Sequence, residues 1–151
     1  CPMAIPFQTA HESHESAAIY ERSLQALWSD AAHEEASPLV DVMLLGLGDD
    51  AHTASLFPHT SALQITDRWA VSNLVPQLNT TRLTLTIPFI LRSRDIAFLV
   101  CGSSKQAALN QVFANEGDAL HAPARSIRSA SQVTWFLDRA AAQAVVPNAE
   151  A

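Results

Sequence analysis

The segment from Leu39 to Leu45 constrains the fold more than any other part of this sequence. It is apolar at every position except Asp41, and it runs directly into Gly46. A short and nearly continuous apolar run is typical of a parallel β-strand that is covered on both faces. Because such a strand needs other layers of structure on each side, the chain is expected to fold as a layered α/β domain.

The rest of the chain alternates between strand-like and helix-like patterns, which predicts a parallel sheet with crossover helices in one domain, residues 1–151. Thr9 and Glu12 have the spacing of a capping box, which predicts the start of the first helix. Pro88 suits a first helical position, and Ser103 can cap a helix. Besides 39–45, strands are predicted over 69–75, 82–87 and 95–101, with a short strand or helix entry over 133–137. Helices are predicted over 10–32, 53–57 (a single turn), 89–93, 103–114 and 138–145.

The composition excludes several classes of protein. With 48% hydrophobic residues the chain has enough apolar material for a core, so disorder is not expected. A formal charge of −6 and scattered basic residues argue against a nucleic-acid surface. No apolar stretch approaches the roughly 20 residues of a membrane span, and no signal-like segment is present. We therefore expect a cytoplasmic protein with no membrane or nucleic-acid partner.

The two cysteines do not form a disulfide framework, which fits a reducing compartment. Cys101 lies in an apolar run just before Gly102, so it is expected to be a small buried residue rather than a nucleophile. The other cysteine, Cys1, begins the chain in place of methionine, which suggests that the sequence is the inside of a longer protein.

The loop that follows the first predicted strand carries the clearest chemical signal. Gly46 and Gly48 permit a sharp turn and a close approach by a ligand. Asp50 lies two residues before His52, so its carboxylate can fix the tautomer of the imidazole. The histidine is then a candidate general base that activates water. The alternative is a polar strand-to-helix turn in which Asp50 or Thr53 caps the helix.

Two basic residues are candidates for a phosphate site. Lys105, the only lysine, follows a strand and a glycine turn at a predicted helix N-terminus, where anions bind. Arg82 opens an alternating strand and can make a bidentate phosphate contact. The alternatives are a solvated lysine and an exposed arginine at a strand start. Ligands of open parallel sheets bind at the carboxyl ends of strands, where we expect Lys105, the Gly46–His52 loop and Asn73 to meet.

The remaining polar candidates are weaker. His11 and His14 have the spacing of a metal pair, but with no third ligand evident a solvated first helical turn is favoured. Ser55 lacks the Gly-x-Ser-x-Gly context of a nucleophile. His59 and His121 are expected in loops.

Residues 46–58 closely resemble the signature of the 6-phosphogluconolactonase family, Gly-x-Gly-x-Asp-Gly-His-Thr-Ala-Ser-Leu-Phe-Pro. Further segments resemble that family in the same order along the chain; these are 82–88, 98–105, 123–125 and 135–138. The resemblance implies a Rossmann-like α/β fold, a parallel-sheet three-layer sandwich. It also implies hydrolysis of 6-phosphoglucono-lactone to 6-phosphogluconate in the oxidative pentose phosphate pathway, with no metal or organic cofactor.

The same resemblance assigns roles to residues of this chain. His52 matches the histidine that would activate water and later protonate the leaving ring oxygen, and Asp50 matches the acidic residue of its loop. Arg82 and Lys105 match positive positions around the sugar phosphate. Gly46 and Gly48, the glycines of the motif, complete the expected substrate site.

Two departures from the family pattern bear on activity. Ala51 stands where the family usually has glycine, and a positive φ there would cost on the order of 1 kcal/mol. The family's N-terminal part, with a phosphate loop and an Asp-Glu-Arg segment, does not appear, so the chain resembles the C-terminal portion of a lactonase. We expect such a chain to be inactive or weakly stable alone, with exposed sheet edges.

Two other functions are compatible with the sequence. A glucosamine-6-phosphate deaminase-like isomerase would share the fold, but those proteins resemble Gly-x-Gly-x-Asp-Gly-His-Ile-Ala-Phe-Asn-Glu-Pro at this loop. Thr53 and the segment 55–58 favour the lactonase. A non-catalytic module that binds sugar phosphates is the other alternative.

Overall fold

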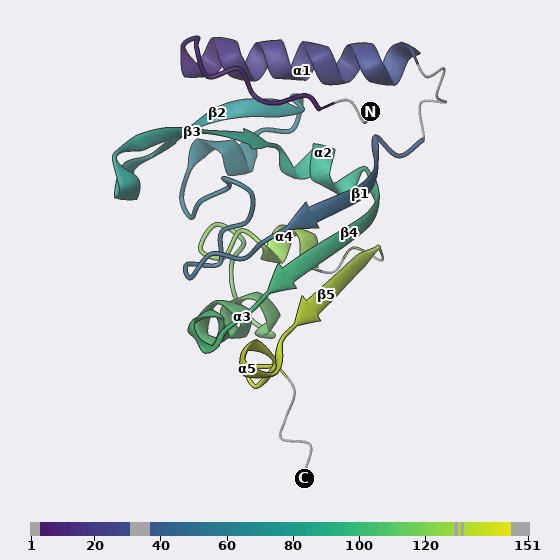
Figure 1. Ribbon diagram of the computed structural model, residues 1–151. Coiled ribbons are helices and arrows are strands. Elements are labelled where there is room, and N and C mark those ends of the chain that lie inside the picture. The colour runs from purple at the N-terminus through teal and green to yellow at the C-terminus, as the bar shows by residue number, and fades with distance from the viewer. Residues whose placement is uncertain (1–3, 31–36, 129, 131, 146–151) are drawn as a thin grey trace.

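The computed structural model describes residues 4–30, 37–128, 130 and 132–145 (Figure 1). The α-helices are α1 (Ser13–Asp30), α2 (Ile87–Leu91), α3 (Gln106–Phe113), α4 (Arg125–Arg128) and α5 (Arg139–Ala142). The strands are β1 (Val40–Leu45), β2 (Ala70–Val75), β3 (Thr80–Leu85), β4 (Ser93–Val100) and β5 (Val133–Leu137). Three short 3₁₀ helices are η1 (Ser61–Gln64), η2 (Pro76–Leu78) and η3 (Ser103–Lys105).

The main sheet is parallel and has the strand order β1-β4-β5. Leu45 of β1 is level with Phe98 of β4, which in turn is level with Trp135 of β5. The Phe98 and Trp135 rings stack with centroids 3.9 Å apart. The parallel α/β arrangement predicted from the sequence is confirmed, and β5 forms a strand.

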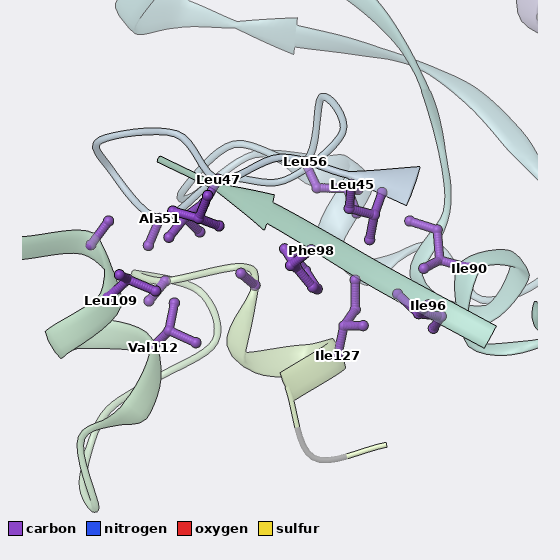
Figure 2. Packing of buried hydrophobic residues seen from close by; sticks show 14 of the residues in the cluster. Leu45, Leu47, Ala51, Leu56, Ile90, Ile96, Phe98, Leu109, Val112 and Ile127 are labelled. Atoms are coloured by element: carbon purple, nitrogen blue, oxygen red, sulfur yellow. The ribbon is translucent and has the colours of Figure 1, made fainter. Parts of the chain in front are cut away.

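One face of this sheet carries the core. Phe98 of β4 is fully buried, and Ile96 and Val100 on the same face are nearly so. Helices α2, α3 and α4 add Ile90, Leu109, Val112 and Ile127, and the loop after β1 adds Leu47, Ala51 and Leu56. Figure 2 shows these side chains around β4. The β1 loop is therefore anchored by its own apolar residues.

A second layer consists of the β2–β3 hairpin under α1. The two strands are antiparallel and form a separate two-stranded sheet, which departs from the expected single parallel sheet. In Figure 1, α1 runs across this hairpin. The carboxylate of Glu21 on α1 accepts hydrogen bonds from Arg68 Nε at 2.6 Å and from the backbone N–H of Trp69 at 2.5 Å. This contact fastens the helix to the start of β2.

Two helix predictions at the ends of the chain need correction. Helix α1 begins at Ser13, where Glu12 C=O accepts the N–H of Ser16 at 2.9 Å. Thr9 therefore lies before the helix, and the predicted capping box is not formed. Helix α5 is shorter than the predicted 138–145, and Asp138 caps it by accepting from Ala141 N–H at 2.8 Å.

The middle of the chain also differs in detail. The predicted helical turn over 53–57 is a tight turn that Leu56 N–H closes onto Thr53 C=O at 2.9 Å. Helix α2 spans 87–91, so it begins and ends two residues earlier than the predicted helix over 89–93, and the Thr86 side chain caps it. Ser103 opens a 3₁₀ turn without a side-chain cap, and α3 begins after it. The predicted loop over 121–129 contains α4.

Cys101 is exposed, contrary to the prediction that it is buried. Successive side chains of a strand point to opposite faces. Because Val100 is buried on the core face, Cys101 falls on the other side.

No described helix is both long and apolar enough to cross a membrane. The end of the predicted first helix, residues 31–32, and the predicted tail from 147 lie outside the described residues.

Candidate active site

The loop after β1 is a compact structure held by its own backbone. Gly48 N–H donates to His52 C=O at 2.9 Å, and Ala51 N–H donates to Gly48 C=O at 3.0 Å. The Thr53 hydroxyl donates back to Gly46 C=O at 2.9 Å, which ties the end of the loop to its beginning. The next helix is the 3₁₀ helix η1, which begins only at Ser61, so the alternative of a polar turn in which Asp50 or Thr53 caps a helix does not describe this segment.

Ala51 has the left-handed backbone conformation that its position suggested, with φ at 60°. The residue is fully buried, and its carbonyl accepts the N–H of Ala124 at 3.1 Å. A non-glycine residue in this region costs roughly 1–2 kcal/mol. The buried methyl group and the hydrogen bond to Ala124 hold the loop in this conformation.

His52 and Asp50 form a close pair. Asp50 Oδ1 lies 2.6 Å from His52 Nδ1 and also accepts the backbone N–H of His52 at 3.2 Å. The ring stacks on Phe57 with centroids 4.0 Å apart and planes inclined by 24°. A carboxylate at Nδ1 assigns the proton of the neutral ring to that nitrogen. Nε2 then carries a lone pair, and within the described residues no group is hydrogen-bonded to it.

Gly48 is required by the position of the His52 ring. A Cβ at residue 48 would lie 2.0 Å from Nδ1 of His52 and 2.8 Å from Asp50 Oδ1. Gly46 is different, because a Cβ there would meet nothing within 4 Å. Of the two predicted glycines, Gly48 is the one with a steric reason to lack a side chain.

Lys105 shares a cavity with His52. The cavity has a volume of about 500 Å³ and is also lined by Leu44, Gly46, Gly48 and Ala54. Lys105 Nζ lies 2.7 Å from Asp49 Oδ1, so the lysine is already paired with a loop carboxylate. The predicted meeting of 46–52 with 102–105 at the carboxyl ends of the strands is therefore observed.

The turn before Lys105 is less open to anions than predicted. Both Asp138 carboxylate oxygens accept the N–H of Gly102, at 3.1 and 3.0 Å. Hydrogen bonds from the N–H groups of Ala141 and then Gly102 lower the pKa of Asp138. That backbone donor is therefore already occupied, whereas the ammonium group of Lys105 lines the cavity of His52.

Arg82 lies in a neighbouring cavity of about 420 Å³ rather than beside His52. That cavity is also lined by Ser55, Thr81 and His11, whereas Ala54 lines the His52 cavity. The two cavities thus flank the turn at residues 54–55. The structure brings together His52, Asp50, Lys105 and Gly48, and it leaves Arg82 apart from them.

The β2–β3 hairpin supports the loop through residues whose role the sequence did not reveal. Asn73 Nδ2 donates to Ser55 C=O at 2.8 Å and to the Thr60 hydroxyl at 2.9 Å. The Thr84 hydroxyl accepts the N–H of Ser55 at 3.1 Å. Asn73 was expected at the end of a parallel strand, but it is buried within an antiparallel one. A polar amide inside an apolar strand was the available signal.

The other histidines do not form metal sites among the described residues. His11 pairs with Glu15 at 3.6 Å. His59 and His121 lie in loops, as predicted, and their rings meet edge to face with centroids 4.3 Å apart.

The fold and the site define a class of protein: a parallel α/β domain with a histidine–aspartate pair on a glycine loop at the carboxyl edge of its sheet. The chain belongs to the family of glucosamine-6-phosphate isomerases/6-phosphogluconolactonase, whose model matches residues 2–135.

The relatives described below are named 6-phosphogluconolactonases. The chain is 48% identical over 127 residues to a 6-phosphogluconolactonase of Nostoc sp., covering 83% of this chain and 51% of the relative. It is 45% identical over 140 residues to one of Synechocystis sp., covering 91% and 56%. Among solved structures, a 6-phosphogluconolactonase from Trypanosoma cruzi matches with a TM-score of 0.70 and 30% identity, over 88% of this chain and 52% of that one. The chain thus spans about half the length of the relatives it matches.

Proposed function

We propose that this chain carries the catalytic loop of a 6-phosphogluconolactonase, which hydrolyses 6-phosphoglucono-lactone to 6-phosphogluconate. The observation that carries the proposal is the pair formed by His52 Nδ1 and Asp50, 2.6 Å apart, beside a cavity that also contains Lys105. The names of the relatives support the same reaction. The proposal includes a place in the oxidative pentose phosphate pathway and a cytoplasmic location.

In the first step of the proposed reaction, His52 Nε2 takes a proton from water as the oxygen attacks the lactone carbonyl. Asp50 keeps the ring in the required tautomer and stabilises the imidazolium that forms. In the second step the C–O bond of the ring breaks, and the imidazolium returns its proton to the departing ring oxygen. The product is the open-chain acid, and His52 is neutral again.

Lys105 is proposed to bind the phosphate of the substrate. Its ammonium group can exchange Asp49 for a phosphate dianion without leaving the cavity that it shares with His52. Arg82 is proposed as a second phosphate-binding residue that acts from the neighbouring cavity. Gly46 and Gly48 give the substrate access to the backbone of the loop, and no metal or organic cofactor takes part.

A chimaera tests the catalytic role of His52. This chain would replace the matched half of the Nostoc lactonase, and disappearance of the lactone would be measured above its spontaneous hydrolysis. His52→Ala should reduce the rate by about 10²- to 10⁴-fold, as expected for loss of a general base. His14→Ala, an exposed histidine on α1, is the matched control. An unchanged rate in the His52 variant would refute the proposal.

A binding measurement separates this proposal from the non-catalytic alternative. A binding module should gain thermal stability with 6-phosphogluconate but leave the lactone to decay at its spontaneous rate. An enzyme should also gain thermal stability with 6-phosphogluconate, and in addition it should make the lactone disappear faster than its spontaneous rate. Lys105→Ala should weaken the stabilisation by the product.

A further inference from the structure

The ring of His52 is restrained by two contacts that act in different ways. Asp50 Oδ1 lies 2.6 Å from Nδ1, and the Phe57 ring stacks on the imidazole with centroids 4.0 Å apart and planes inclined by 24°. A hydrogen bond restricts distance and direction at Nδ1, but it leaves the ring free to turn about the line that joins the two atoms. Such a turn would change the direction in which the Nε2 lone pair points. The stacked ring opposes the turn because it favours nearly parallel planes.

Phe57 can restrain the imidazole only because it is itself held in place. The residue is buried, with 6% of its surface exposed. Its carbonyl oxygen accepts hydrogen bonds from the Thr60 hydroxyl at 2.7 Å and from the Thr60 N–H at 3.3 Å. Pro58 follows directly and restricts the backbone of Phe57 further. Both the side chain and the main chain of Phe57 are therefore fixed.

Thr60 is held in turn by the β2–β3 hairpin. Its hydroxyl oxygen accepts a hydrogen bond from Asn73 Nδ2 at 2.9 Å, and the same amide nitrogen donates to Ser55 C=O at 2.8 Å. Asn73 lies within β2 and is fully buried, and Thr60 is nearly so. A buried hydroxyl that donates one hydrogen bond and accepts another has a defined orientation. The contacts from Asn73 through Thr60 and Phe57 to His52 are hereafter the positioning path.

The loop enters the apolar core with other residues. Leu47, Ala51 and Leu56 belong to the core cluster of the described residues, which surrounds β4. Phe57 is buried as well, but it is not a member of that cluster. It packs against the ring of His52 instead. This placement suits a residue that orients the imidazole better than one that only anchors the loop.

We propose that Asn73, Thr60 and Phe57 are positioning residues for the reaction of His52, so that the hairpin sets the direction of its proton transfer. The proposal rests on the proposed function, because it requires His52 to act as the general base. A general base must be within hydrogen-bond reach of the proton that it takes, in a suitable geometry. The positioning path should therefore affect the chemical step more than substrate binding, for which Lys105 is the proposed contact.

The chimaera of this chain with the Nostoc lactonase tests the path through a matched set of variants. Thr60→Val keeps the size of the side chain but cannot bond to Asn73 or to the Phe57 carbonyl. It should lower kcat by about two- to tenfold, the equivalent of one neutral hydrogen bond, and change KM little. Thr60→Ser keeps the hydroxyl and should restore kcat toward the parent value. Phe57→Leu removes the stacked ring and should lower kcat by about 10- to 100-fold.

A double variant separates positioning from general damage to the fold. Because Thr60 acts through Phe57, Thr60→Val should have little effect once Phe57→Leu has removed the stacked ring. The variant with both changes should be about as slow as Phe57→Leu alone, whereas independent losses would multiply. Glu21→Gln weakens the contact of α1 with the start of β2 but lies outside the path. It is the control for lost stability and should keep the parent kcat at temperatures where every variant is folded.

An NMR measurement on the same chimaera tests the path without relying on activity. The ring current of Phe57 shifts the resonances of the His52 ring protons, which are identified by their absence from the spectrum of His52→Ala. Thr60→Val should reduce this shift, and Thr60→Ser should preserve it.

Two results would overturn the proposal. The first is a Thr60→Val variant with the parent kcat and the parent resonances of His52, and the second is a double variant in which the two losses multiply. Failure of the proposed function looks different. If the parent chimaera does not hydrolyse the lactone while Thr60→Val still shifts the His52 resonances, the path holds and the lactonase chemistry does not. If His52→Ala abolishes activity and Thr60→Val changes nothing, the chemistry holds and the path does not.

Discussion

Replacing Gly48 by alanine should displace the His52 ring and leave the rest of the fold in place. The new Cβ would lie 2.0 Å from Nδ1 and 2.2 Å from Cε1 of the ring. Carbon atoms in contact are normally about 3.5–4.0 Å apart, so the ring must move by roughly 1–2 Å. Such a movement breaks the hydrogen bond to Asp50 and the stacking on Phe57.

The size of the effect follows from these contacts. A hydrogen bond to a charged group is worth about 1.5–3 kcal/mol and an aromatic pair about 0.5–1.5 kcal/mol. The His52 side chain is 27% exposed, so water replaces part of what is lost and the cost in stability falls below the sum. A reacting group displaced by about 1 Å can slow a reaction about 10²-fold. We therefore expect a large loss of rate with a small loss of stability.

The chimaera with the Nostoc lactonase provides the assay, and His14→Ala, an exposed histidine on α1, is the control that should keep the parent rate. A Cβ at Gly46 meets nothing within 4 Å, so Gly46→Ala should leave the His52 ring in place. The imidazole resonances of His52, followed by NMR, should therefore change in the Gly48 variant and not in the Gly46 variant. A Gly48→Ala chimaera with the parent rate, or equal changes of these resonances in the two glycine variants, would refute the steric reasoning.

Three further predictions concern stability and its dependence on pH. Ala51→Gly relieves about 1–2 kcal/mol of backbone strain, but it removes a buried methyl group and raises the conformational entropy of the unfolded chain. These effects oppose each other, so the free energy of unfolding in denaturant should stay within about 1 kcal/mol of the parent. A loss above about 2 kcal/mol would contradict this. Asn73→Leu leaves the Ser55 carbonyl without its donor, and a loss of about 1–3 kcal/mol is expected in the same measurement. Burial alone would raise the pKa of Glu21, but hydrogen bonds and charge from Arg68 outweigh it and lower that pKa. The stabilisation that these interactions give is thus fully present above the pKa of Glu21 in the unfolded chain, about 4.3. It is lost as the pH falls through the lower pKa of Glu21 in the folded protein. Glu21→Gln should reduce the decrease in the free energy of unfolding at acid pH, and an unchanged decrease would contradict the assignment.

The parts of the site that could be predicted are local in sequence. The strand over 39–45 was recognisable because a buried parallel strand has an almost unbroken apolar run. Asp50 and His52 are two residues apart, so their pairing needed no knowledge of the rest of the fold. The meeting of this loop with Lys105 followed from a general property of parallel sheets, whose carboxyl ends share one edge.

The parts that could not be predicted depend on contacts between distant segments. Alternating apolar residues identified the strand of Arg82, but they did not indicate that this strand pairs antiparallel with β2. That pairing places Arg82 in a different cavity from His52. The support of Ser55 by Asn73 and Thr84 joins residues 18 and 29 positions apart. No periodic pattern encodes such hydrogen bonds. The start of α1 was misplaced because capping-box spacing is a weak local signal that the folded chain can override.

The loop over 46–60 connects the two layers of the molecule, since its apolar residues enter the core of the parallel sheet and Asn73 and Thr84 bind it to the hairpin. It therefore determines whether the layers melt as one cooperative unit. Trp28 and Trp69 contact each other in the layer of α1 and the hairpin, and Trp135 lies in the parallel sheet. With Trp28 replaced by phenylalanine, weakening the loop's bonds to the hairpin should split a single thermal transition into two, and the fluorescence of Trp69 and Trp135 should change at different temperatures.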